Sequence, residues 1–144
     1  MKLAKALKEK NVLIKEIQVL KQRFQTYNST VVGTEIPYEV TKTFADLMEK
    51  QGALVALKMK IYKANMPIQE DIFRIAELKT LITILRSTST NNGIVKSRGY
   101  GEKTEDEYVA VYKTVAVDNM VAEFEKTINE TQERIDAHNH TTEI

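Results

Sequence analysis

The 144-residue sequence contains no cysteine and no tryptophan, two prolines and five glycines. Without cysteine, the chain can form no disulfide and can use no thiolate as a nucleophile or metal ligand. So few prolines and glycines argue against a turn-rich all-β fold and against a long disordered tail. The net charge of +1 predicts no general attraction to nucleic acid or anionic lipid.

Long apolar runs are also missing. The longest are Ala53–Leu57 and Tyr108–Tyr112, far short of the ~18 consecutive apolar residues that cross a membrane. Lysines recur every few residues from Lys2 onward, so the N-terminal stretch lacks the apolar centre of a signal peptide. We therefore expect a cytoplasmic protein of a bacterial type.

Charge is unevenly distributed along the chain. Residues 1–23 carry seven cations against two carboxylates, whereas residues 118–144 carry seven carboxylates against two cations. The two ends could lie side by side, within one chain or between chains, or remain two solvated faces.

Apolar residues recur at helical spacing in four stretches, which predicts helices over roughly 2–27, 38–64, 69–88 and 119–138. In the first stretch they follow a heptad repeat. One seam position of the repeat holds Leu3, Lys10, Ile17 and Phe24, and the other holds Ala6, Leu13, Leu20 and Tyr27. Leu7 and Ile14 widen this stripe beyond a strict two-stranded seam.

Local signals mark where these helices begin and end. Pro37 suits the start of the second helix, and Asn65 and Pro67 end it. Glu70 favours a helix start because the helix dipole stabilises negative charge there. Gly52 falls inside the second helix, where it either permits close approach of another helix or marks a bend.

The segment before the last helix changes character. Tyr108–Val117 alternates with a period of two and is rich in β-branched residues, which predicts a strand. Ile94–Arg98 is its expected partner, giving a hairpin over about 94–117. Asp118 would then be the N-cap of the last helix.

Together these patterns predict one mainly α domain over residues 1–144. We expect long antiparallel helices, in a bundle or coiled-coil arrangement, with a small β-hairpin before the last helix. Helices of this length reach roughly 39 Å, more than one small chain covers, so we predict a homo-oligomer. The candidate subunit-interface residues are Leu3, Leu7, Ile14, Ile17, Phe24, Val121, Phe124, Ile128 and Ile135.

Residues with catalytic or metal-binding chemistry are sparse. His138 and His140 are two positions apart, so on a helix they point in different directions and do not converge on a metal. The sequence contains no nucleophile elbow and no phosphate-binding glycine loop. We therefore predict no enzyme activity, no catalytic or metal-ligating residues and no cofactor.

One loop combines cations with an aromatic ring, as single-stranded nucleic-acid sites do. Its candidate contact residues are Lys96, Arg98, Tyr100 and Lys103. The acidic residues that follow, Glu102 and Glu105–Glu107, cancel much of this attraction. A charged hairpin loop without a ligand is the simpler interpretation.

Three short segments, Met1–Leu7, Ile61–Asn65 and Ile135–Ile144, resemble the small bacterial septicolysin-like proteins, a domain family of unknown function. The resemblance extends over nearly the full length, with His140 where the family pattern has tryptophan. It implies no catalytic residues, and the family name implies a pore-forming cytolysin. Our leading prediction is a non-enzymatic, self-assembling structural or protein-interaction protein. The alternatives are a membrane-active, pore-forming protein and a nucleic-acid binder.

Overall fold

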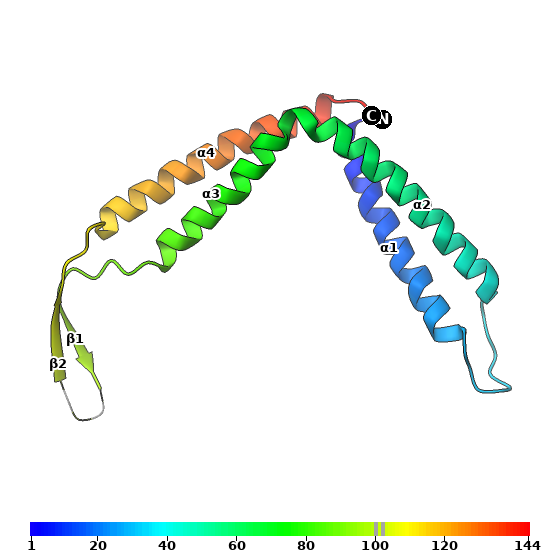
Figure 1. Cartoon of the computed structure of the whole chain (residues 1–144), viewed down its shortest axis with the longest axis horizontal. Helices are drawn as coiled ribbons and strands as arrows, with labels where there is room; N and C mark the ends of the chain where they lie inside the picture. The colour runs from blue at the N-terminus through cyan, green and yellow to red at the C-terminus, as the bar shows by residue number, and fades with distance from the viewer. Residues whose placement is uncertain (100, 102) are drawn as a thin grey trace. The chain divides into compact units, whose positions relative to one another are not determined.

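The computed structural model describes residues 1–99, 101 and 103–144. The elements in chain order are α1 (Leu3–Tyr27), α2 (Val40–Asn65), the 3-10 turn η1 (Met66–Ile68), α3 (Gln69–Ser87), β1 (Gly93–Arg98), β2 (Lys103–Tyr108) and α4 (Thr114–Thr141) (Figure 1). The predicted fold class is confirmed, because the chain is mainly helical with a small antiparallel hairpin before the last helix. It divides into two compact units, residues 1–68 with 136–144, and residues 69–135.

In the first unit, α1 and α2 pack along each other as an antiparallel helical hairpin (Figure 1). The heptad seam predicted for α1 is confirmed, because all eight of its residues are buried or partly buried. The matching positions of α2 are also buried or partly buried, namely Val40, Thr43, Leu47, Lys50, Leu54, Leu57, Ile61 and Ala64. Two facing heptad seams are the packing of a two-stranded coiled coil.

The tightest part of this unit lies where the two chain ends meet. Leu3 and Ala6 are fully buried against Ile61, and the C-terminal residue Ile144 packs on the same cluster. The backbone N–H of Leu3 donates to the carbonyl oxygen of Thr142 at 2.9 Å, and that of Ile144 donates to Met1 at 2.9 Å. The C-terminal residues therefore cover the first turn of α1, where the basic and acidic ends of the chain come into contact.

At the other end of the α1–α2 hairpin, aromatic side chains close the seam. The rings of Phe24 and Phe44 lie with centroids 4.9 Å apart, and those of Tyr27 and Tyr38 lie 5.6 Å apart. The guanidinium of Arg23 lies 4.4 Å from the centre of the Tyr38 ring, a cation–π contact. These contacts anchor the loop that joins the two helices.

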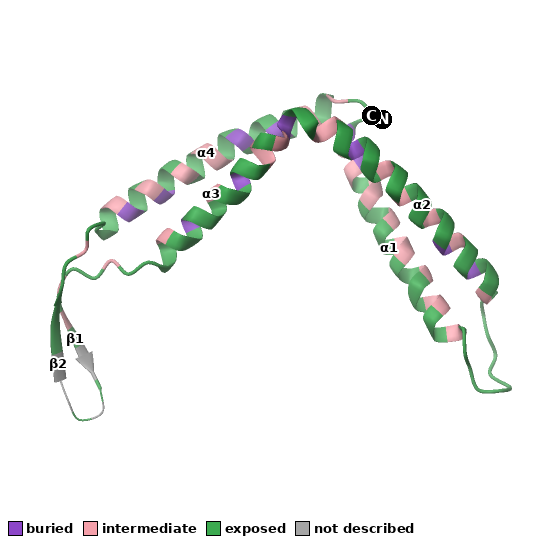
Figure 2. Cartoon of the chain, in the orientation of Figure 1, coloured by how far each residue is buried: buried purple, intermediate pink, exposed green. Residues whose placement is uncertain are grey.

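The second unit is built from α3 and the adjoining part of α4, which lie side by side and antiparallel (Figure 1). Asp71 pairs with Arg134 at 2.9 Å near one end, and Arg86 pairs with Glu125 toward the other. The buried residues of α3 and α4 are Ile75, Ile82, Val117, Val121, Thr131 and Ile135, and Figure 2 shows the buried positions of both helices in purple. Each helix thus presents one apolar stripe to the other.

The predicted hairpin is correct for its first strand and wrong for its second. β1 pairs with β2, so Lys96 lies opposite Glu105 and Gly93 opposite Tyr108. The predicted strand Tyr108–Val117 contributes only Tyr108. Pairing with the nearer segment closes a shorter loop, which costs less conformational entropy, and it sets Lys96 opposite Glu105.

The start of the last helix was predicted too late, and Asp118 is not its N-cap. α4 begins at Thr114 and includes the valines that alternate like a strand. Val117 and Val121 are four residues apart, so on a helix both face α3, where both are buried. Burial on α3 overrides the β propensity of these valines. The helix also continues to Thr141, three residues beyond the predicted end.

Candidate interaction surfaces

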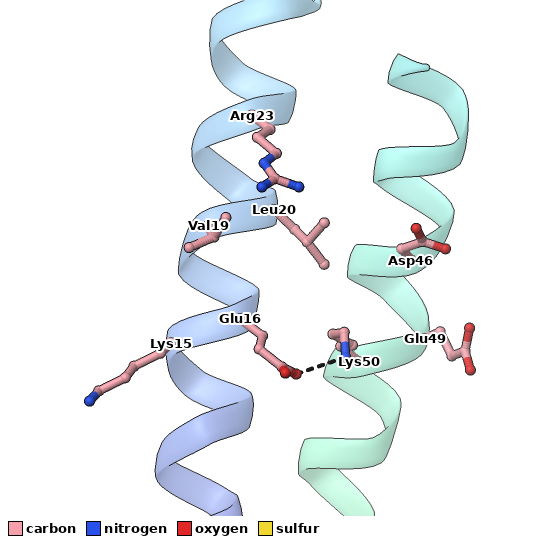
Figure 3. Close-up of a pocket in the computed structure, with 8 residues that line it drawn as sticks. All are labelled: Lys15, Glu16, Val19, Leu20, Arg23, Asp46, Glu49 and Lys50. Carbon is pink, nitrogen blue, oxygen red and sulfur yellow. Dashed lines mark hydrogen bonds and ion pairs between the residues drawn. The ribbon is translucent and has the colours of Figure 1, made fainter. Parts of the chain in front are cut away.

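A charged groove runs between α1 and α2 in the first unit. Lys50 Nζ donates to Glu16 Oε2 at 2.7 Å across the helix pair, and this hydrogen bond raises the pKa of Lys50. Figure 3 shows these two side chains pointing toward each other, whereas Lys15 and Glu49 point away. The groove is lined by Lys15, Glu16, Val19, Leu20, Arg23, Asp46, Glu49 and Lys50.

Lys50 occupies a seam position of α2 that would otherwise hold an apolar side chain. A single polar residue at such a position costs stability but selects one register, because its charge has its partner in that register alone. We therefore interpret the Glu16–Lys50 pair as fixing the alignment of α1 and α2.

A second charged cluster joins the chain ends. Glu143 accepts hydrogen bonds from Lys2 Nζ and from the N-terminal ammonium, both at 2.8 Å. These two bonds, the one from Lys2 foremost, lower the pKa of Glu143 to about 2. The carboxylate therefore stays ionised in the folded chain well below the usual range for glutamate.

The ionised Glu143 makes the stability of the folded chain depend on pH in the acidic range. The folded-state pKa of Glu143 is lowered from 4.5 to about 2, so its contribution is present above pH 4.5 and is lost as the pH falls toward 2. We expect the urea midpoint of Glu143→Gln to lie below that of the native chain at pH 6. The two midpoints should converge as the pH falls through this window. A difference that stays constant over this range would contradict the assignment.

His138 has a structural contact that the sequence did not predict. Its Nε2 donates to the carbonyl oxygen of Ala64 at 2.9 Å, and Thr142 Oγ1 lies 3.3 Å from its Nδ1. The ring therefore links the end of α4 to the end of α2 within the first unit. Among the residues that the structure describes, no three histidine, aspartate or glutamate side chains are grouped as metal ligands.

The residues predicted as subunit contacts lie on stripes that the chain itself covers to different degrees. Leu3, Val121 and Ile135 are buried. Leu7, Ile17, Phe24, Phe124 and Ile128 are partly buried. Ile14 is exposed, with 44% of its surface accessible. Leu3, Leu7, Ile14, Ile17 and Phe24 lie on α1, and Val121, Phe124, Ile128 and Ile135 lie on α4.

Three of the four predicted nucleic-acid contacts, Lys96, Arg98 and Lys103, lie on the two strands of the hairpin. Lys96 is exposed and forms a 3.5 Å ion pair with Glu105 on the facing strand. Arg98 pairs with Lys103 in the strand register, and Tyr100 lies outside the described residues. The one candidate cation whose side chain is described is thus already paired with a carboxylate.

The largest feature that the sequence analysis missed is a second heptad seam on α2. We call it the outer seam, and it consists of Ala45, Met48, Gly52, Val55, Met59 and Tyr62 on α2, with Met66 as the first residue of η1. All seven residues are exposed, and none is charged. Its signal is present in the sequence, because the same alternating spacing of three and four residues recurs beside the buried seam from Val40 to Ala64 that faces α1.

Other large apolar side chains are exposed in the second unit. Between the hairpin and the first turn of α4, the exposed ones are Tyr108, Val109, Val111, Tyr112 and Val115. On α3 they are Phe73, Leu81 and Ile84. Exposed apolar side chains of this kind, where they gather into a patch, are typical of interaction sites in folded proteins.

Comparison with family models, with curated proteins and with solved structures gave no significant match. The similarity to septicolysin-like proteins therefore stays a prediction. Within the described part of the chain, no helix has the length and apolar character needed to span a membrane.

Proposed function

We propose that this chain is a non-enzymatic helical interaction protein that assembles with copies of itself in the cytoplasm. One observation carries the proposal: large apolar side chains stay exposed in both units although other apolar residues are already buried between the paired helices. Water contact with so much apolar surface is unfavourable, and covering it in an oligomer removes that cost.

Self-assembly predicts a sedimentation result. At micromolar concentration the chain should sediment as an oligomer, and dilution should shift it toward smaller species by mass action. We would measure this by sedimentation velocity over a hundredfold concentration range. A single monomeric species across that whole range would contradict the proposal.

A membrane-active, septicolysin-like protein is the second candidate. The exposed apolar residues of the segment 108–115 favour it, because valine and tyrosine side chains partition into the membrane interface. Release of a trapped dye from liposomes distinguishes the two candidates. A membrane-active chain releases dye and loses that activity in Val109→Ser/Val111→Ser, whereas an interaction protein releases none.

A further inference from the structure

We propose that the outer seam of α2 binds the outer seam of a second copy of this chain, with the two α2 helices antiparallel. The inference rests on the proposed self-assembly and specifies its surface and orientation. It is carried by the completeness of the seam, by the charges beside it and by the sizes of its side chains.

The outer seam is uninterrupted and open. From Ala45 to Met66 it extends roughly 32 Å at about 1.5 Å per residue. Met48, Val55, Met59, Tyr62 and Met66 each expose between 51% and 63% of their surface. A Cβ placed on Gly52 would meet nothing within 4 Å. All seven residues stay exposed although α1 packs along α2, so a second helix can reach the whole seam.

Charged residues beside the seam favour an antiparallel pair. Glu49 and Lys63 flank one side, and Lys58 flanks the other. In a parallel, in-register pair, Lys58 would face Lys63 of the second copy on both sides. In an antiparallel pair whose two-fold axis lies at the level of Leu57, Glu49 faces Lys63 of the second copy twice. Flanking charges of this kind set helix orientation.

Side-chain sizes favour the same alignment. In the antiparallel pair, Gly52 lies opposite Tyr62 of the second copy, and Val55 lies opposite Met59. The smallest residue of the seam thus receives the largest, so the layer fills without a cavity. A parallel pair would instead set Gly52 against Gly52 and Tyr62 against Tyr62, leaving one layer empty and the other overfilled.

One contact opposes the antiparallel pair. Lys58 would lie near Lys58 of the second copy, close to the two-fold axis. Its long side chain can carry the ammonium outward into water, so this single repulsion is weaker than the two attractive Glu49–Lys63 pairs. Replacing Lys58 with an uncharged residue removes a repulsion in either orientation, so it tests whether Lys58 lies beside the interface.

The first experiment tests the surface. Val55→Glu should raise the dimer dissociation constant about 30-fold or more, because it places a charge in the centre of the interface. Val12→Glu is the matched control, since Val12 is 54% exposed on α1 and Val55 is 62% exposed on α2. The control should associate like the native chain. Sedimentation equilibrium and far-ultraviolet circular dichroism report association and helix content of each variant.

The second experiment tests the orientation by exchanging charges. Glu49→Lys should weaken association about tenfold, and the double variant Glu49→Lys/Lys63→Glu should restore it. Lys58→Gln should tighten association about threefold, since it removes the repulsion at the axis. In a parallel pair, Lys63→Glu alone would tighten association by creating attractive pairs with Lys58.

The third experiment needs no disruptive substitution. Because the chain has no cysteine, Val55→Cys and Met59→Cys each introduce a single thiol. After the two variants are mixed and mildly oxidised, the disulfide that links one Val55→Cys chain to one Met59→Cys chain should form fastest. Disulfides that link two copies of the same variant should form more slowly. A parallel pair would give the reverse, with each variant linking to its own copy.

The outcomes separate the two proposals. A native chain that stays monomeric overturns self-assembly and this interface together. An oligomer that tolerates Val55→Glu and yields no mixed disulfide overturns this interface and leaves self-assembly in place. Preferential self-linking of each cysteine variant overturns the antiparallel orientation.

Discussion

Replacing Leu3 by alanine should lower the free energy of unfolding of the first unit by about 2–5 kcal/mol. Leu3 has no accessible surface, and it packs in one cluster with Ala6 and Ile61. The substitution removes apolar contacts and leaves a cavity that helix backbones cannot easily fill. Urea unfolding followed by circular dichroism, with hydrogen exchange in α1 and α2, measures the effect.

Val12→Ala is the control for this prediction. Val12 lies on the same helix but is 54% exposed, so its truncation should change stability by no more than about 0.5 kcal/mol. If Leu3→Ala and Val12→Ala had equal effects, the C-terminal residues would not cover the start of α1 as described.

Aspartate in place of Val121 should destabilise the second unit by about 3–5 kcal/mol. Val121 is 8% exposed, so the new carboxylate would be buried, and Arg86, which lines the same hollow, is already paired with Glu125. Asp118 and Glu125 lie three and four residues away on the same helix, and their charges would repel it. Hydrogen exchange should accelerate in α3 and in the adjoining part of α4.

The same substitution at Val115 is the control. Val115 is 71% exposed in the first turn of α4, where the helix dipole favours a negative charge. Val115→Asp should therefore leave exchange in α3 unchanged or slightly slower. An equal loss of protection from both variants would show that burial of Val121 is not what holds α3 and α4 together.

The spacing of apolar residues predicted the helices well where the heptad repeat was uninterrupted. The repeat from Leu3 to Tyr27 specified both the length of α1 and the residues of its buried seam, because heptad spacing is a local property of the chain. The same spacing from Ala45 to Met66 forms a second seam, which the sequence predictions do not include. A helix with two seams has apolar residues on most of its faces, so the two heptad repeats must be counted separately to be distinguished.

The region around the hairpin could not be predicted from local patterns. Tyr108–Val117 satisfies the strand pattern, yet Val117 and Val121 also satisfy the helical one. The choice depends on whether those valines gain more from strand pairing or from burial on α3. That difference in free energy depends on contacts between residues far apart in the sequence. A short stretch of sequence therefore does not determine it.

The sequence by itself determined that the chain is mainly helical, where the apolar stripes lie, and that a hairpin precedes the last helix. Tertiary structure decided which stripe covers which. It pairs α1 with α2 and α3 with α4, sets Glu143 beside Lys2, and leaves the outer seam exposed. The physical reason is that spacing fixes which face of a helix is apolar, whereas the partner of that face is set by competition among all faces for burial.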